Sequence, residues 1–136
     1  MQLLSLAAFG LAALLALAFG ARYIFTREFM PYHATVVGKP WAALEPRLQL
    51  IILNMLRVAG AGLLGYGVAL LWLLLPIQRG ESWAVWAALT VSLVVDLPIL
   101  YVVVRLRRIE PAAKTPVVPC VMVLVLVLAG SIASLV

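Results

Sequence analysis

Two charged residues, Arg57 and Asp96, stand inside otherwise apolar stretches of the chain. A charged side chain at the centre of a bilayer costs roughly 2.5–3.5 kcal/mol on insertion scales, so it usually faces the protein interior and pairs there. Arg57 lies ten residues after Arg47, and Asp96 lies nine residues before Arg105. At about 1.5 Å per residue, both charges would lie roughly 14 Å from the basic ends of two neighbouring helices. The spacing therefore predicts a buried Arg57–Asp96 ion pair.

Polar residues at helical spacing surround this predicted pair, and together they predict one intramembrane polar cluster. Its members are Asn54, Arg57, Ser92 and Asp96, to which Tyr66 and Tyr101 could add hydroxyl groups. Two uses of the cluster stay open. It either fixes the register of two helices and does nothing more, or it lines a small cavity that takes an ion, a proton or a polar head group.

The polar loop at 25–47 contains the single histidine of the chain, His33. Glu28, Met30, His33 and Trp41 are the residues we expect to make contacts at the membrane interface, where amphipathic aromatic rings gather. A metal site usually needs three or four suitable ligands, and one His with one Met does not reach that number. Pro31 is expected to interrupt any helix here. A contact with a partner, or a gating role, is the alternative use of this segment.

Motifs of catalysis are missing from the sequence. It contains no Gly-rich phosphate loop, no HExxH, no CxxC and no serine nucleophile motif. One cysteine cannot form an internal disulfide. We therefore expect no catalytic residue, no metal and no cofactor, and we do not expect an enzyme.

The elements that must position these residues are long apolar helices. Hydrophobic residues make up 66% of the 136 residues and charged residues 11%, whereas a soluble domain averages roughly 45–50% and about 25%. About 20 apolar residues cross a bilayer core. The sequence predicts an all-α, four-helix membrane bundle in one domain, with spans at about 3–24, 48–75, 83–104 and 117–136. Pro40 would begin a short interfacial helix in the loop, and Pro46 would begin the second span.

Small residues recur every four positions on two of these spans, and such faces let helices approach closely in lipid. The first span carries Ala8, Ala12, Ala16 and Gly20, and the second carries Ala61 and Gly65. We expect these faces to pack the bundle. One of them, such as the face on the first span, could instead dock another protein.

Basic residues set the expected orientation, because cytoplasmic loops are enriched in Lys and Arg. The side with the first and third loops holds eight Lys and Arg in the loops and at the helix ends, whereas the side with both termini and the second loop holds only Arg79. We therefore expect both termini on the non-cytoplasmic side. The net charge of +5 indicates a membrane surface rather than nucleic acid. The Ala-, Leu-, Val- and Gly-rich composition favours a bacterial cytoplasmic (inner) membrane.

The RVAGAGLLGYG stretch at 57–67 follows a first span and a Pro-containing polar loop. This layout resembles small uncharacterised bacterial four-helix membrane proteins, including those broadly like the DoxX group. The resemblance covers the layout of about the first 75 residues and transfers no functional residue.

Three functions are favoured, and a membrane enzyme stays open as a fourth alternative. The first is a non-enzymatic accessory or interaction subunit that acts through another membrane protein or a second copy. The second is a small ion- or proton-coupled transporter or channel subunit that uses Arg57 and Asp96. The third is a binder of a lipid, quinone-like or other lipophilic small molecule between the helices.

Overall fold

The computed structural model describes residues 1–135, and no strand occurs in that range. It contains five α-helices and one short 3-10 helix. In chain order these are α1 (Gln2–Phe25), α2 (Pro31–Val37), η1 (Trp41–Ala43), α3 (Pro46–Gln78), α4 (Ser82–Ile109) and α5 (Val117–Leu135). Four of the helices, α1, α3, α4 and α5, are long and apolar enough to cross a membrane. The chain is therefore an all-helical, multi-pass protein with the four long helices that the sequence predicted, and the short helix of the loop is α2.

The short helix α2 corrects two expectations for the polar loop. Pro31 begins α2 instead of interrupting a helix, because the first helical position needs no backbone N–H donor and a fixed φ suits it. The helix expected to begin at Pro40 is only the 3-10 turn η1. Pro46 occupies the first position of α3 for the same reason as Pro31.

The turn between α3 and α4 makes these two helices antiparallel neighbours. Pro76 lies within the last turn of α3 rather than in the loop. Gly80 adopts a left-handed φ of 78°. The N–H of Glu81 donates to the Pro76 carbonyl at 3.0 Å, and the N–H of Gly80 donates to the Ile77 carbonyl at 3.0 Å. These two bonds satisfy the last carbonyl groups of the helix in a Schellman motif.

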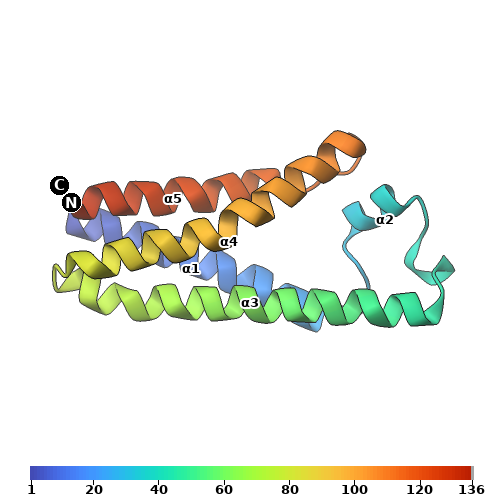
Figure 1. Cartoon of the computed structure of the whole chain (residues 1–136), viewed down its shortest axis with the longest axis horizontal. Helices are drawn as coiled ribbons and strands as arrows, with labels where there is room; N and C mark the ends of the chain where they lie inside the picture. Colours follow the sequence, from blue (N-terminus) through green and yellow to red (C-terminus); the bar gives the residue numbers. More distant parts are fainter. Residues whose placement is uncertain (136) are drawn as a thin grey trace.

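The four long helices form a bundle in which α1 packs against α3 and α5, and α4 packs against α5 and α3. Both termini lie at the end of the bundle that holds the α3–α4 turn, whereas α2 and the α4–α5 link lie at the opposite end (Figure 1). The core contains large side chains such as Phe9, Leu70 and Val127, all fully buried.

Glycines set the close approach of α1 and α3. A Cβ atom at Gly60 would lie 2.8 Å from the carbonyl oxygen of Gly20, and one at Gly67 would lie 3.0 Å from the carbonyl oxygen of Ala13. Such contacts leave no room for a side chain, so only glycine fits. The four small residues predicted on α1 are all buried in the bundle: Ala8, Ala12, Ala16 and Gly20.

The small residues predicted on the second span do not take part in this packing. Ala61 and Gly65 are exposed, and a Cβ at Gly65 would meet no atom within 4 Å. Successive residues of a helix are rotated by about 100°. The inward face follows Gly60 and Gly67, so the predicted pair lies on the outer side of α3.

The first turns of α3 extend beyond the end of α1. Gly60 lies against Gly20 and Ile24, next to the last residues of α1. The part of α3 before it packs against the folded loop, where Phe29, Leu44 and Leu56 form a second small apolar core. This part of the helix therefore lies beside the loop rather than between the other spans.

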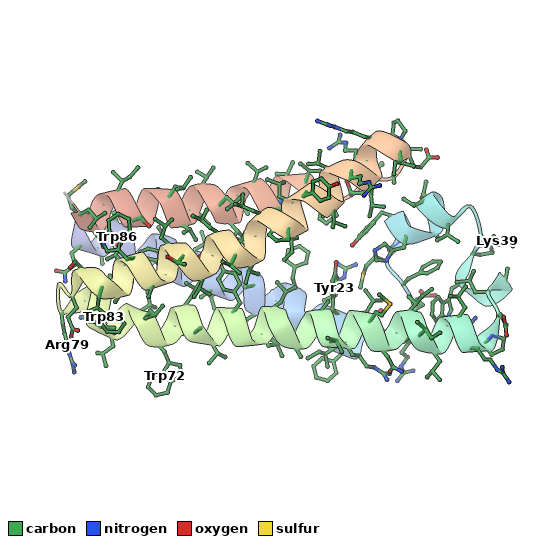
Figure 2. The ribbon with its side chains drawn as sticks, in the orientation of Figure 1. Tyr23, Lys39, Trp72, Arg79, Trp83 and Trp86 are labelled. Atoms are coloured by element: carbon green, nitrogen blue, oxygen red, sulfur yellow. The ribbon has the colours of Figure 1, made fainter. Side chains whose placement is uncertain are left out.

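Exposed tryptophans gather toward the end of the bundle that holds the α3–α4 turn. Trp72, Trp83 and Trp86 are all exposed, and Figure 2 shows them toward the same end as Arg79. Tryptophan rings are enriched at membrane–water interfaces. Their position is consistent with a bilayer boundary near this turn.

Candidate functional site

Asp96 is buried in the middle of the bundle, with 7% of its surface exposed. Its Oδ2 accepts a hydrogen bond from the Tyr66 hydroxyl of α3 at 3.0 Å. The same hydroxyl oxygen lies 2.8 Å from Ser92 Oγ, and its single proton can serve only one of these two contacts at a time. Ser92 donates to the Ala88 carbonyl at 2.7 Å. Ser92 and Asp96 face the same way because they are four residues apart on α4. The polar centre is therefore Asp96, Tyr66 and Ser92.

The number of available protons limits which of these hydrogen bonds can form at the same time. A hydroxyl group has one proton to donate. When Ser92 donates to Ala88 and Tyr66 donates to Ser92, the contact between Tyr66 and Asp96 is completed by a proton on the carboxyl group. When Asp96 is charged, Tyr66 donates to it and Ser92 turns to Tyr66. The same three side chains can therefore form hydrogen bonds with either a protonated or a charged carboxyl group.

The predicted ion pair between Arg57 and Asp96 is not formed, because the two residues lie at different depths along the bundle. Arg57 and Asn54 are exposed on α3, and the hydrogen bond that Asp96 receives within residues 1–135 comes from Tyr66. The predicted depth of Arg57 was counted from Arg47, at the start of a helix whose first turns lie beside the loop. Arg57 is instead level with the end of α1, about nine residues or roughly 14 Å along α3 from Tyr66.

A cavity of about 360 Å³ lies beside Asp96, between the four long helices. Its walls are mainly apolar side chains from all four spans, and its polar groups include Asp96 and Tyr66. Ala59 and Gly62 line it and are also exposed, so the cavity reaches the outer surface of α3. It lies where α4 diverges from α3 toward the loop end of the bundle (Figure 1).

The shape and lining of this cavity suit a small apolar molecule. Ligand pockets range over roughly 300–1,000 Å³ and are mostly apolar with a few polar groups that fix orientation. Here the carboxyl of Asp96 and the hydroxyl of Tyr66 are the fixed polar groups. An opening toward lipid would admit a molecule that is already dissolved in the bilayer.

A second pocket of about 310 Å³ lies at the loop end of the bundle. It is lined by Arg22 and Tyr23 of α1, the start of α2 and the α4–α5 link with Lys114. Phe19, Tyr23 and Pro116 line both pockets. The apolar cavity and the basic pocket therefore meet along one wall.

The predicted loop contacts divide into buried and exposed residues. Met30 is buried and its backbone N–H donates to His33 Nδ1 at 3.3 Å. Burial lowers the pKa of His33 from its ordinary value of 6.5. The rings of Trp41 and Phe29 meet edge to face at 5.0 Å, while Glu28 is exposed. These contacts stabilise the folded loop, and no group of three His, Cys, Asp or Glu able to hold a metal ion occurs in residues 1–135.

From the sequence, Arg22 and Lys114 served only to predict the orientation of the chain in the membrane. Arg22 and Lys114 are 92 positions apart in the chain, so no local motif connects them. Tyr66 could be found from the sequence, because it is a hydroxyl-bearing residue inside an apolar span, and its hydroxyl was offered to the predicted cluster.

No protein-family model, no curated protein sequence and no solved structure matches the chain. The candidate site therefore rests on the geometry of this chain alone, and the resemblance to the DoxX group stays a prediction.

Proposed function

We propose that the chain is a non-enzymatic membrane protein that binds a lipophilic small molecule in the cavity between its four spans. One observation carries the proposal: a mainly apolar cavity of about 360 Å³ reaches the outer surface at Gly62 and contains the Asp96–Tyr66 pair. Burying apolar surface adds little affinity within lipid, so the polar pair supplies selectivity. A ligand with one hydroxyl, carbonyl or amine group would hydrogen-bond there, while its apolar part fills the remaining space.

Gly62 offers a direct test, because a Cβ at this position would meet no atom within 4 Å. Gly62→Leu should therefore fill the cavity without forcing the helices apart. Gly65→Leu is the matched control, since Gly65 has the same free space but does not line the cavity. Native mass spectrometry of protein released from membrane nanodiscs should find a retained lipophile on the wild type and on Gly65→Leu, but not on Gly62→Leu. Equal retention by all three proteins would refute the proposal.

A second candidate is the interaction subunit, favoured by the outer face of α3. Asn54, Arg57, Ala61 and Gly65 are all exposed on this helix, and small residues allow another helix to approach closely. The matching test is the mass of the protein in detergent. A species larger than one 14.7 kDa chain that reverts to a monomer in Gly65→Leu would support it, and a monomeric wild type would contradict it.

The proposed orientation places the loop end of the bundle in the cytoplasm. Arg57 lies at this end together with eight other Lys and Arg from the loops and helix ends, against Arg79 alone at the other. By the positive-inside rule, both termini face away from the cytoplasm, and the membrane we propose is a bacterial inner membrane. Labelling a cysteine placed at each end in intact cells tests this orientation.

A further inference from the structure

The basic pocket at the end of the apolar cavity combines charge and hydrogen-bond donors. Arg22 lies in the last turn of α1, and Lys114 lies in the α4–α5 link. No acidic side chain is among the residues that line the pocket; besides the two cations they are Phe19, Tyr23, Met30, Pro31, Tyr32 and Pro116. Two positive charges without an acidic neighbour favour an anion.

Two tyrosines add a neutral donor to this pocket. The hydroxyls of Tyr23 and Tyr32 are 2.8 Å apart, and both tyrosines line the pocket. Burial raises the pKa of Tyr32 well above its ordinary value, so its hydroxyl keeps its proton. One proton joins the two oxygens, and the other is free to donate to a bound anion.

The position of the pocket relates it to the lipid head groups. Arg22 is three residues from the end of α1, where a membrane helix leaves the hydrocarbon core. Basic pockets between spans on the cytoplasmic side are typical binding sites for phosphate head groups. Because Tyr23, Phe19 and Pro116 line both pockets, one molecule can occupy the apolar cavity and the basic pocket together.

We propose that the bound molecule is an amphiphile with an anionic phosphate head held by Arg22 and Lys114 and an apolar part in the cavity, where a hydroxyl or carbonyl group of the same molecule meets Asp96 and Tyr66. This inference rests on the proposed function and names the ligand class. Arginine binds phosphate oxygens with two parallel donors, and lysine adds a point charge. Together with the spare tyrosine proton they match the several acceptor oxygens of a phosphate better than the two of a carboxylate.

The experiment compares lipid retention by native mass spectrometry after reconstitution into phosphatidylcholine nanodiscs. Separate arms contain dioleoyl phosphatidate, oleate, or inorganic phosphate added as a competitor of phosphatidate. The test variant is R22Q/K114Q. Its control is R27Q/K39Q, which removes one Arg and one Lys that are exposed like Arg22 and Lys114 but do not line the pocket. R22K/K114R keeps both charges and serves as the conservative variant.

We expect the wild type, the control and the conservative variant to prefer phosphatidate to phosphatidylcholine. In R22Q/K114Q that preference should fall by roughly 10-fold or more, since each basic side chain near the membrane surface contributes about fivefold. An unchanged preference in R22Q/K114Q overturns the inference. Equal retention of oleate overturns the assignment of a phosphate, and full displacement by inorganic phosphate overturns the assignment of a lipid.

Failure of this inference and failure of the proposed function give different results. If Gly62→Leu abolishes retention of all lipids while R22Q/K114Q changes nothing, the cavity binds a lipophile but the head-group assignment is wrong. If Gly62→Leu retains phosphatidate as the wild type does, the cavity itself is not the binding site.

Discussion

Removing the Tyr66 hydroxyl should destabilise the bundle more than replacing the Asp96 carboxyl group with an amide. Tyr66→Phe leaves Asp96 and Ser92 buried without the partner that bridges them at 3.0 and 2.8 Å. An unsatisfied buried group costs about 1–3 kcal/mol, and hydrogen bonds between membrane helices contribute about 0.6 kcal/mol on average, with a maximum near 1.7. Since two buried groups lose a partner, we expect a loss of about 1–2 kcal/mol in the free energy of unfolding.

Asp96→Asn provides the comparison. Its amide NH₂ can donate to the Tyr66 oxygen as a protonated carboxyl does, so Ser92 keeps its bond to Ala88. We therefore expect Asp96→Asn to change the free energy of unfolding by less than about 1 kcal/mol. Tyr101→Phe is the control for losing a tyrosine hydroxyl, because Tyr101 is 63% exposed and its contact with Arg105 is 3.5 Å long.

The assay is equilibrium unfolding in mixed micelles, followed by helical circular dichroism. The reasoning predicts that Tyr66→Phe is the least stable of the three variants and Tyr101→Phe matches the wild type. If Asp96→Asn is as unstable as Tyr66→Phe, the network requires a charged carboxylate and the proton count is wrong. If Tyr66→Phe is as stable as the wild type, the hydrogen bonds contribute nothing to the fold.

Two further predictions concern packing and pH. Gly60→Ala should lower the free energy of unfolding by about 1–3 kcal/mol through overpacking, because its Cβ would lie 2.8 Å from the Gly20 carbonyl oxygen. Gly65→Ala meets no atom and should be neutral or slightly stabilising in the same assay. Equal effects of the two substitutions would contradict the close approach of α1 and α3. Burial lowers the pKa of His33 below 6.5, so the unfolded chain binds a proton at this residue at a higher pH than the folded chain does. The stability contributed by the neutral His33 ring is therefore present above about pH 6.5 and is lost as the pH falls through the folded pKa. His33→Gln should flatten the pH dependence of the unfolding midpoint below about pH 6.5, and a slope equal to that of the wild type would contradict this.

The membrane-crossing helices follow from the sequence because length and composition alone determine them. The long apolar runs have no charge to place in lipid except Arg57 and Asp96, and the helix start at Pro46 has a local cause in its fixed φ. The packing face of α1 could be predicted as well, because its small residues repeat every four positions along one side of the helix.

Tertiary contacts account for what the sequence did not predict. The depth of Arg57 depends on how far α3 extends past α1, and this is decided by the packing of Leu56 against the folded loop. Helix α2 has only seven residues, too few to be stable alone, so its existence depends on the same packing. The cavity also requires the divergence of α4 from α3, and Pro98 inside α4 is the local feature of the sequence that can bend this helix.

Photo-crosslinking tests the central claim most directly. A lipid with a diazirine in its acyl chain, irradiated in the bilayer with the purified protein, should label cavity-lining residues such as Leu63, Ile99 and Val123. We predict that Gly62→Leu removes the label from these residues and leaves it on outward-facing ones, while Gly65→Leu keeps the wild-type pattern. Identical labelling of the cavity residues in all three proteins would contradict a lipophile bound between the four spans.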